Sequence, residues 1–322
     1  MACGAEAAVA GLAADGPGVL AGVVVNASAG DAPVPGAEVV LRIRQAGQFI
    51  PWSKTLCDEH GRFRFERLPV GPECLYLPGA NRHGVHYPGP RVQLTAVEPR
   101  AAVRLAVYDA VESPNPLVLQ LHEVTVRADR LALRVTEYLR IENPTRLCYV
   151  GRPAEAGKPP VTLALAIPME FERATFDKEF FGRRFSVGTG GMITHVPWPP
   201  GTHELRFTYT LPRTDRRCTW QRSIDLRCQQ FQLIVEADPA DQVTCNLPAA
   251  PFQQPAGRRF CSSTPLEPGH RVEVVIQTRA ISPQAAARWA AIALLATAVA
   301  AGATTAWRAR RQNGPKSPAK AR

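Results

Sequence analysis

The chain has 322 residues, enough for about two domains of ordinary size. Hydrophobic residues make up 45% and charged residues 20%, a balance that excludes an intrinsically disordered chain. The net charge is +10, but six of the 38 basic residues lie in the last fifteen positions, which hold no acid. The other 32 basic residues are nearly balanced by 28 acidic ones. We therefore expect no basic face of the kind that binds nucleic acid.

Residues 1–16 form a weakly apolar N-terminal segment, interrupted by Glu6, and the first basic residue is Arg42. A secretory signal normally begins with basic residues, so this segment is at most the remnant of a signal region. We expect the true start to lie upstream of Met1. The alternative is a tail-anchored protein of opposite orientation, which would violate the positive-inside rule.

Residues 17–112 carry short runs in which every second residue is apolar, separated by stretches rich in Gly and Pro. A period of two predicts β-strands, and no helical period is present. The clearest predicted strands are residues 19–26, 39–43, 63–65, 92–94 and 103–107. Lys54 falls in a stretch that reads as a loop.

The order of motifs in this region is GVVVN, then PVPGAEVVL, then D-x-x-G-R-F-R-F-x-x-L-P-x-G. It resembles the carboxypeptidase regulatory-like domain, a transthyretin-like, seven-stranded Greek-key sandwich. The resemblance implies that Gly36 and Gly61 lie at turns and that Phe63, Phe65 and Leu68 lie in the core. Turn and core residues identify a fold rather than an activity, so the resemblance implies an accessory module.

Two chemistries associated with such domains find no support in the residues. The H-x-x-E pair of zinc peptidases occurs only as His270 and Glu273, in a predicted strand where residues three apart face opposite sides. A Lys–Asn isopeptide needs a Lys on an early strand, and residues 19–26 contain none. We therefore predict a protein that is not an enzyme and binds no cofactor.

Residues 113–280 continue the β pattern, with alternating runs at 131–141, 161–167, 205–211 and 272–276. Only Glu137 breaks the apolar side of the first run. Strands with one apolar face imply sheets packed on a common core, so we predict a second β-sandwich. The phrase LRVTEYLRIENPTRLCYVG is loosely similar to a segment of bacterial envelope proteins that carry the regulatory-like domain.

The eight cysteines include no C-x-x-C pair, so neither a zinc ribbon nor a thioredoxin-like site is expected. In an oxidising compartment, neighbouring cysteines could close local loops. The alternative is that they are buried free thiols. The candidate disulfide pairs are Cys218 with Cys228 and Cys245 with Cys261.

Three further features resemble sites but lack the residues that a site needs. His83 and His86 suggest a metal pair without a third ligand, so we predict a loop or hairpin and no metal. Residues 188–191 are glycine-rich but lack the Lys of a phosphate loop. Ser186 lacks the glycine that a nucleophile elbow needs two positions before the serine, because Arg184 stands there. The aromatic residues Trp52, Trp198 and Trp220 could stack on sugars or belong to the core.

Residues 289–307 read WAAIALLATAVAAGATTAW and contain no charge, and residues 281–288 form a predicted linker before them. As a helix they span about 28 Å, close to the hydrocarbon thickness of a bilayer. Nine of the nineteen are Ala, so a buried helix is the alternative. The flanking charges favour a membrane span. The predicted interface residues are Arg288, Trp289, Trp307, Arg308, Arg310 and Arg311.

Together these features predict a mainly β protein with two sandwich domains and a single pass through the bacterial cell membrane. The basic tail, residues 308–322, is expected in the cytoplasm and the β domains outside. The predicted partners are membrane lipid and a protein or polysaccharide ligand. The predicted function is non-catalytic display for binding or structural roles. A carbohydrate-binding module and a single-pass subunit of a membrane complex are the alternatives.

Overall fold

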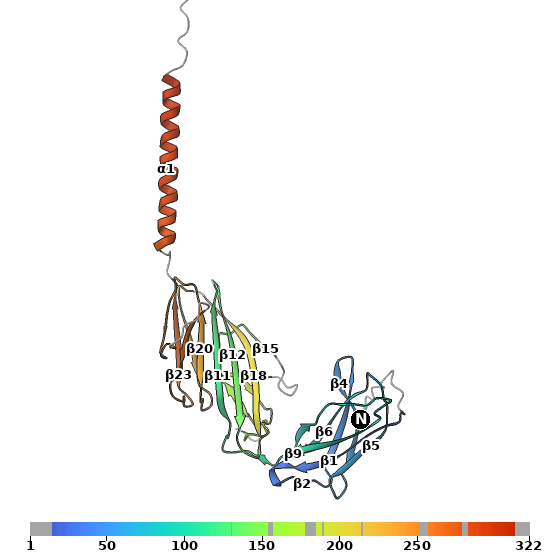
Figure 1. Ribbon diagram of the computed structural model, residues 1–322. Coiled ribbons are helices and arrows are strands. Elements are labelled where there is room, and N and C mark those ends of the chain that lie inside the picture. The colour runs from blue at the N-terminus through green and yellow to red at the C-terminus, as the bar shows by residue number, and fades with distance from the viewer. Residues whose placement is uncertain are drawn as a thin grey trace, which may run out of the picture.

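The computed structural model describes residues 15–129, 131–153, 157–177, 185–188, 190–213, 215–250, 257–278 and 283–312. Within these ranges the chain is mainly β, with one long apolar helix, α1, at its C-terminal side (Figure 1). The predicted fold class is thereby confirmed. The packing of the sheets as two sandwiches stays a prediction. Most of the predicted segment 1–16 and the tail beyond residue 312 lie outside the described residues.

The first part of the chain, which we call the N-terminal unit, contains two sheets. One has the order β2–β1–β5 with β9 parallel to β1: β1 (Gly18–Asn26), β2 (Ala32–Pro33), β5 (Arg62–Leu68) and β9 (Arg100–Val107). The other has the order β4–β3–β6–β7 with β8 beside β6: β3 (Glu38–Gln45), β4 (Gln48–Leu56), β6 (Leu75–Arg82), β7 (Val85–Pro88) and β8 (Val92–Gln93). A short 3₁₀ turn (Ala27–Ala29) follows β1.

Both sheets of the N-terminal unit contribute to one hydrophobic cluster. Phe63 and Phe65, which alternation placed on one face of a strand, are buried there, and so is Leu68, which the resemblance implied as a core residue. Gly61 adopts φ +72°, and a Cβ there would lie 2.8 Å from the Val24 carbonyl oxygen, so this turn requires glycine. The loop predicted around Lys54 is wrong, because Lys54 lies in β4. Polar and apolar residues are mixed on this strand, and most of its side chains are not buried, so it gives no clear period.

The second part, which we call the C-terminal unit, is built on a six-stranded sheet. Its order is β15 (Arg173–Phe176), β18 (Gly201–Pro212), β12 (Ala132–Asn143), β11 (Val118–Ala128), β20 (Phe231–Glu236) and β22 (Arg258–Cys261). Two three-stranded sheets accompany it. The β14 sheet has the order β14 (Leu163–Leu165), β17 (Gly191–Thr194) and β16 (Ser186–Gly188). The β19 sheet has the order β19 (Arg217–Ser223), β23 (Arg271–Gln277) and β21 (Gln242–Cys245).

The six-stranded sheet buries one face. On β12 every second residue from Leu133 to Ile141 is buried, whereas the intervening residues are partly or fully exposed. The β14 sheet and the β19 sheet both contribute to the hydrophobic cluster on that face, through Leu163 and Leu165 and through Trp220 and Val274. We call these two small sheets, which share a hydrophobic cluster with the buried face of the large sheet, the second layer.

A short ladder joins the two units. β10 (Ala110–Val111) runs parallel to β13 (Cys148–Tyr149), where Cys148 packs in the N-terminal cluster and Tyr149 in the C-terminal one. Asp109 supports this junction by accepting hydrogen bonds from Asn26 Nδ2 at 3.0 Å and from Arg82 Nη2 at 2.7 Å. The N-terminal unit consequently lies at the end of the C-terminal unit that is remote from α1 (Figure 1).

The helix α1 spans Pro283–Gln312, and its stretch Ala287–Thr305 is long and apolar enough to cross a membrane. None of the residues in that stretch is buried by the described part of the chain, so within those residues it is not a core helix. The helix begins earlier than predicted, because most of the proposed linker 281–288 is helical. Its alanines are strong helix formers, and proline is favoured at a first helical position. Arg308, Arg310 and Arg311 lie within the last turns of α1 rather than after it.

Candidate functional site

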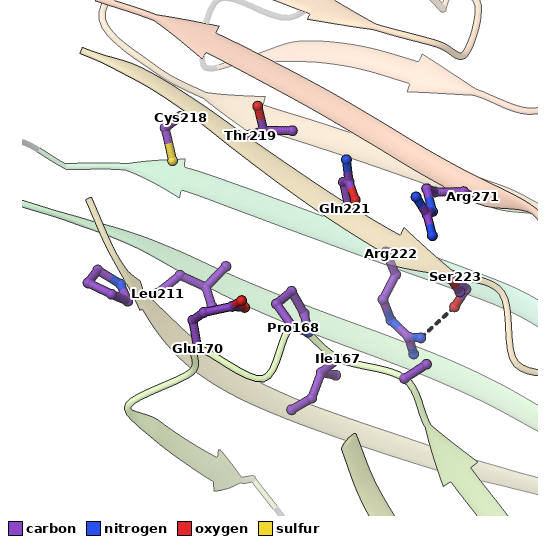
Figure 2. A pocket seen from close by; sticks show the side chains of 12 residues that line it. Ile167, Pro168, Glu170, Leu211, Cys218, Thr219, Gln221, Arg222, Ser223 and Arg271 are labelled. Atoms are coloured by element: carbon purple, nitrogen blue, oxygen red, sulfur yellow. Dashed lines mark hydrogen bonds between the residues drawn. The ribbon is translucent and has the colours of Figure 1, made fainter. Parts of the chain in front are cut away.

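A hollow of about 470 Å³ lies in the C-terminal unit between β19 and residues 166–170. Figure 2 shows Ile167, Pro168 and Glu170 on one side and Thr219 and Gln221 on the other. Leu211 and Arg271 also line this space. We call it the β19 groove.

The β19 groove exists because the second layer is split. Among the described residues, β14 and β19 each have a hydrogen-bonded neighbour strand on one side only, so each forms the edge of its own small sheet. A hydrogen bond of 2.8 Å from the Ala166 N–H to Asp225 Oδ1 joins the two segments that follow these strands. No backbone ladder between β14 and β19 occurs in the described part of the chain.

The register of β19 determines which of its backbone groups face the groove. The Arg216 carbonyl accepts a hydrogen bond from the Thr278 N–H, and the Ile224 N–H donates one to the His270 carbonyl. Because the direction of the backbone groups alternates along an antiparallel strand, the even-numbered residues of β19 form the hydrogen bonds to β23. Odd-numbered residues therefore direct their backbone groups toward the groove. Among the described residues, the backbone N–H and C=O groups of Thr219 and Gln221 have no hydrogen-bond partner.

A fully buried polar cluster lies beside the groove, centred on Glu137 of β12. The Arg222 Nε lies 3.1 Å from each Glu137 carboxylate oxygen, and the guanidinium also donates to Asp225 Oδ2 at 2.6 Å. The Tyr209 hydroxyl donates to Glu137 Oε1 at 2.9 Å, and His122 Nε2 lies 2.9 Å from Oε2. The cluster thus connects β11, β12 and β18 of the large sheet with β19 of the second layer.

The charges of this cluster compensate one another. Burial acts to raise the pKa of Glu137, but the Arg222 guanidinium and the hydrogen bonds from His122 and Tyr209 outweigh it and lower the pKa to about 2. Burial likewise acts to lower the pKa of Arg222, and the neighbouring carboxylates of Glu137 and Asp225 raise it. Glu137, Arg222 and His122 have no exposed side-chain surface, so solvent-borne substrates do not reach them. The arrangement fits a structural ion pair better than a catalytic acid and base.

Sequence reasoning noticed one member of this cluster and missed the rest. Glu137 broke an apolar alternation, which signals a buried charge in need of a partner. Arg222 stands among other arginines in RTDRRCTWQRS and carries no local signal that separates it from them. The partnership depends on contacts between strands 85 residues apart, which the one-dimensional pattern does not contain.

The predicted disulfides are absent from the structure, where Cys218, Cys228, Cys245 and Cys261 are free thiols. Cys218 lies opposite Ile276, and β19 continues from it for about 16 Å before the chain reaches Cys228, opposite Leu266. This separation exceeds what a disulfide spans. Cys245 lies in the β19 sheet and Cys261 in the six-stranded sheet. Burial raises the pKa of Cys228 to about 11, which disfavours the reactive thiolate.

The candidate sugar-stacking residues do not form a platform. Trp198 and Trp220 belong to the core with 1% and 0% of their surfaces exposed, and Trp52 is half-buried on β4. His83 lies in the turn between β6 and β7, and His86 on β7 hydrogen-bonds Asn81 through Nδ1 at 2.7 Å. Within the described ranges, no three His, Cys, Asp or Glu side chains are grouped as metal ligands.

Two other predicted features are also placed by the structure. The glycine-rich stretch 188–191 connects β16 and β17, with Gly188 paired to Gly191 and Ser186 on β16. Of the predicted interface residues, Arg288, Trp289 and Trp307 are exposed on α1. The two tryptophans lie about 27 Å apart along the helix. The side chains of Arg308, Arg310 and Arg311 are outside the described part of the structure.

No protein-family model matches the chain, and no match was found among curated proteins.

Proposed function

We propose that this protein is a non-catalytic, single-pass protein of the bacterial cell membrane that displays two β-sandwich domains for binding. The observation that carries the proposal is the apolar stretch Ala287–Thr305 of α1, which follows the β units and has no residue buried by the described part of the chain. A bare apolar helix of this length is unfavourable in water and matches the thickness of a bilayer.

The orientation is argued from charge. The fifteen residues after position 307 carry six basic groups and no acid, and this excess favours the cytoplasmic side. The β units then lie on the extracytoplasmic side. The similarity of the N-terminal unit to the regulatory-like domain fits display, because such domains usually accompany another unit.

A single-pass subunit of a membrane complex is the second candidate. The open edge of β19 favours it, since unpaired backbone groups beside a groove suit a polypeptide partner. The carbohydrate-binding alternative has less support, because burial of Trp198 and Trp220 removes two of the three aromatic side chains that it needed.

The five lysines of the chain offer a direct test of this orientation. Lys54 on β4 is exposed at 75% of its side chain, whereas Lys316 and Lys320 belong to the basic tail. We expect a membrane-impermeant amine reagent to label Lys54 on spheroplasts of cells that express the full chain. It should label Lys316 and Lys320 only after the membranes are opened, as read by peptide mass spectrometry.

The Lys54→Arg variant is the matched control, because it removes the labelled amine and keeps the charge. Labelling of Lys316 and Lys320 on closed spheroplasts, with Lys54 protected, would establish the tail-anchored orientation and refute the proposed one.

A further inference from the structure

We infer that the β19 groove receives an extended segment of a partner polypeptide, which adds to β19 as an extra strand of the second layer. This inference rests on the proposed function, because it names the kind of partner that the displayed C-terminal unit binds. It commits to an extended peptide with apolar residues facing the core and acidic residues facing outward.

The backbone of β19 provides the first part of the argument. Thr219 and Gln221 each direct an N–H and a C=O toward the groove, two residues apart, and none of these groups has a partner among the described residues. This repeat matches the ladder spacing of an antiparallel strand. Residues 166–170 on the opposite side of the groove do not act as this antiparallel partner of β19. The Ile167 N–H donates to the Leu165 carbonyl, and Pro168 has no N–H.

The groove surface provides the second part. Ile167 and Leu211 contribute apolar surface, and both are largely buried at 2% and 7% exposure. Side chains of an added strand that point the same way as Cys218 and Trp220 would contact the apolar surface of Ile167 and Leu211. Alternate residues of the partner should therefore be aliphatic.

Charge provides the third part. Arg217 and Arg271 mark the two ends of the exposed face, because Arg217 begins β19 and Arg271 pairs with Ser223 at its end. In the described part of the chain, neither guanidinium forms an ion pair with an acid. An added strand with acidic residues at both ends would place one carboxylate beside Arg217 and the other beside Ser223, about 10 Å from the backbone of Arg271, whose long side chain lines the groove.

The test uses the full chain in lipid nanodiscs and one synthetic probe, acetyl-Asp-Val-Thr-Val-Thr-Val-Asp-amide. Its Val residues would face the core, and its terminal Asp residues would lie beside Arg217 and Ser223 in either direction. We expect saturable binding by calorimetry, with slowed hydrogen exchange at the Thr219 and Gln221 amides. The same peptide with Lys in place of both Asp residues should bind more weakly.

Thr219→Pro removes one outward N–H without touching the ladder to β23, so it should weaken probe binding about 2- to 10-fold. Val243→Pro is the matched control. Val243 lies on β21 at the opposite edge of the same sheet, and its N–H also points away from β23. This variant should bind the probe as the wild type does.

Three outcomes would overturn the inference: no binding at the highest soluble probe concentration, protection confined to other amides, or equal weakening by both proline variants. The hydrogen-exchange result needs no variant, so a Thr219→Pro chain that fails to fold leaves the test intact. Insertion of α1 into the nanodisc is measured separately. If α1 is inserted but the probe does not bind, the groove assignment is refuted and the membrane proposal stands.

Discussion

Glu137 shows how one residue can break the pattern of a strand and still stabilise it. A carboxylate at a core position is unfavourable unless charge and hydrogen bonds compensate it. Here Arg222, His122 and Tyr209 provide that compensation from three other strands. The ion pair also joins β12 of the large sheet to β19 of the second layer, so it fixes the position of the strand that borders the groove.

Acid should therefore destabilise the C-terminal unit through Glu137. Its pKa in the folded protein, about 2, lies below the ordinary value of 4.5. The ionised carboxylate therefore contributes its full stabilisation at pH values above 4.5. This stability is lost as the pH falls from 4.5 toward 2. Glu137→Gln should lower the free energy of unfolding at neutral pH by about 3–5 kcal/mol and flatten this acid dependence. Urea unfolding followed by hydrogen exchange of the β12 amides measures both effects.

The control for this prediction is Glu204→Gln on the neighbouring strand β18, where the side chain is exposed on the other face of the sheet. It should leave neutral stability within about 0.5 kcal/mol of the wild type. A Glu137→Gln chain with the same neutral stability and the same acid dependence as the wild type would contradict the role assigned to the ion pair.

At the scale of elements, alternation found several of the strands that have one apolar face, but β11 and β20, which also bury alternate residues, were not among the predicted runs. It predicted β1, β3, β9, β12, β18 and β23 close to their observed ranges. It missed β6, whose neighbouring residues Pro78, Gly79 and Ala80 give no period, and β19, whose inward side includes Arg222. The β19 groove could not be predicted for the same reason. It depends on an edge strand without a clear pattern and on a gap that arises only when distant segments pack.

The hairpin β16–β17 offers a test at this scale. Gly191 has φ +143°, and a Cβ there would lie 1.9 Å from the Leu165 carbonyl oxygen on β14. Gly191→Ala must therefore displace β14, with an expected loss of about 2 kcal/mol or more in the free energy of unfolding. Gly190→Ala is the matched control, since Gly190 has φ +154° but no atom within 4 Å of the added carbon.

An alanine would be strained to a similar extent at both positions. The difference in unfolding free energy between the two variants therefore reports the contact with β14. Urea unfolding of the two chains gives that difference directly. Equal losses for the two variants would show that strain alone accounts for the effect and that β14 and β17 are packed less closely than described.

At the scale of the whole molecule, the chain places two hydrophobic clusters in series, and the apolar helix α1 follows them. The apolar stretch of that helix and its flanking residues were readable from the sequence, because hydropathy and charge are local properties. The junction through Asp109, β10 and β13 could not be predicted from the sequence, because it depends on the pairing of residues 110 and 148, which are far apart along the chain. The mainly β class and the apolar helix near the C-terminus were thus the most predictable features.

The central claim is that α1 holds the β units to a membrane, and alkaline carbonate extraction of membranes containing the full chain tests it most directly. We predict that the wild type and Val97→Arg, at a 90% exposed site of the N-terminal unit, stay in the membrane pellet. The double variant Leu294→Arg, Val299→Arg should be released, because each arginine at the centre of a span costs about 2.5–3.5 kcal/mol. Release of the wild-type chain by carbonate would contradict the account.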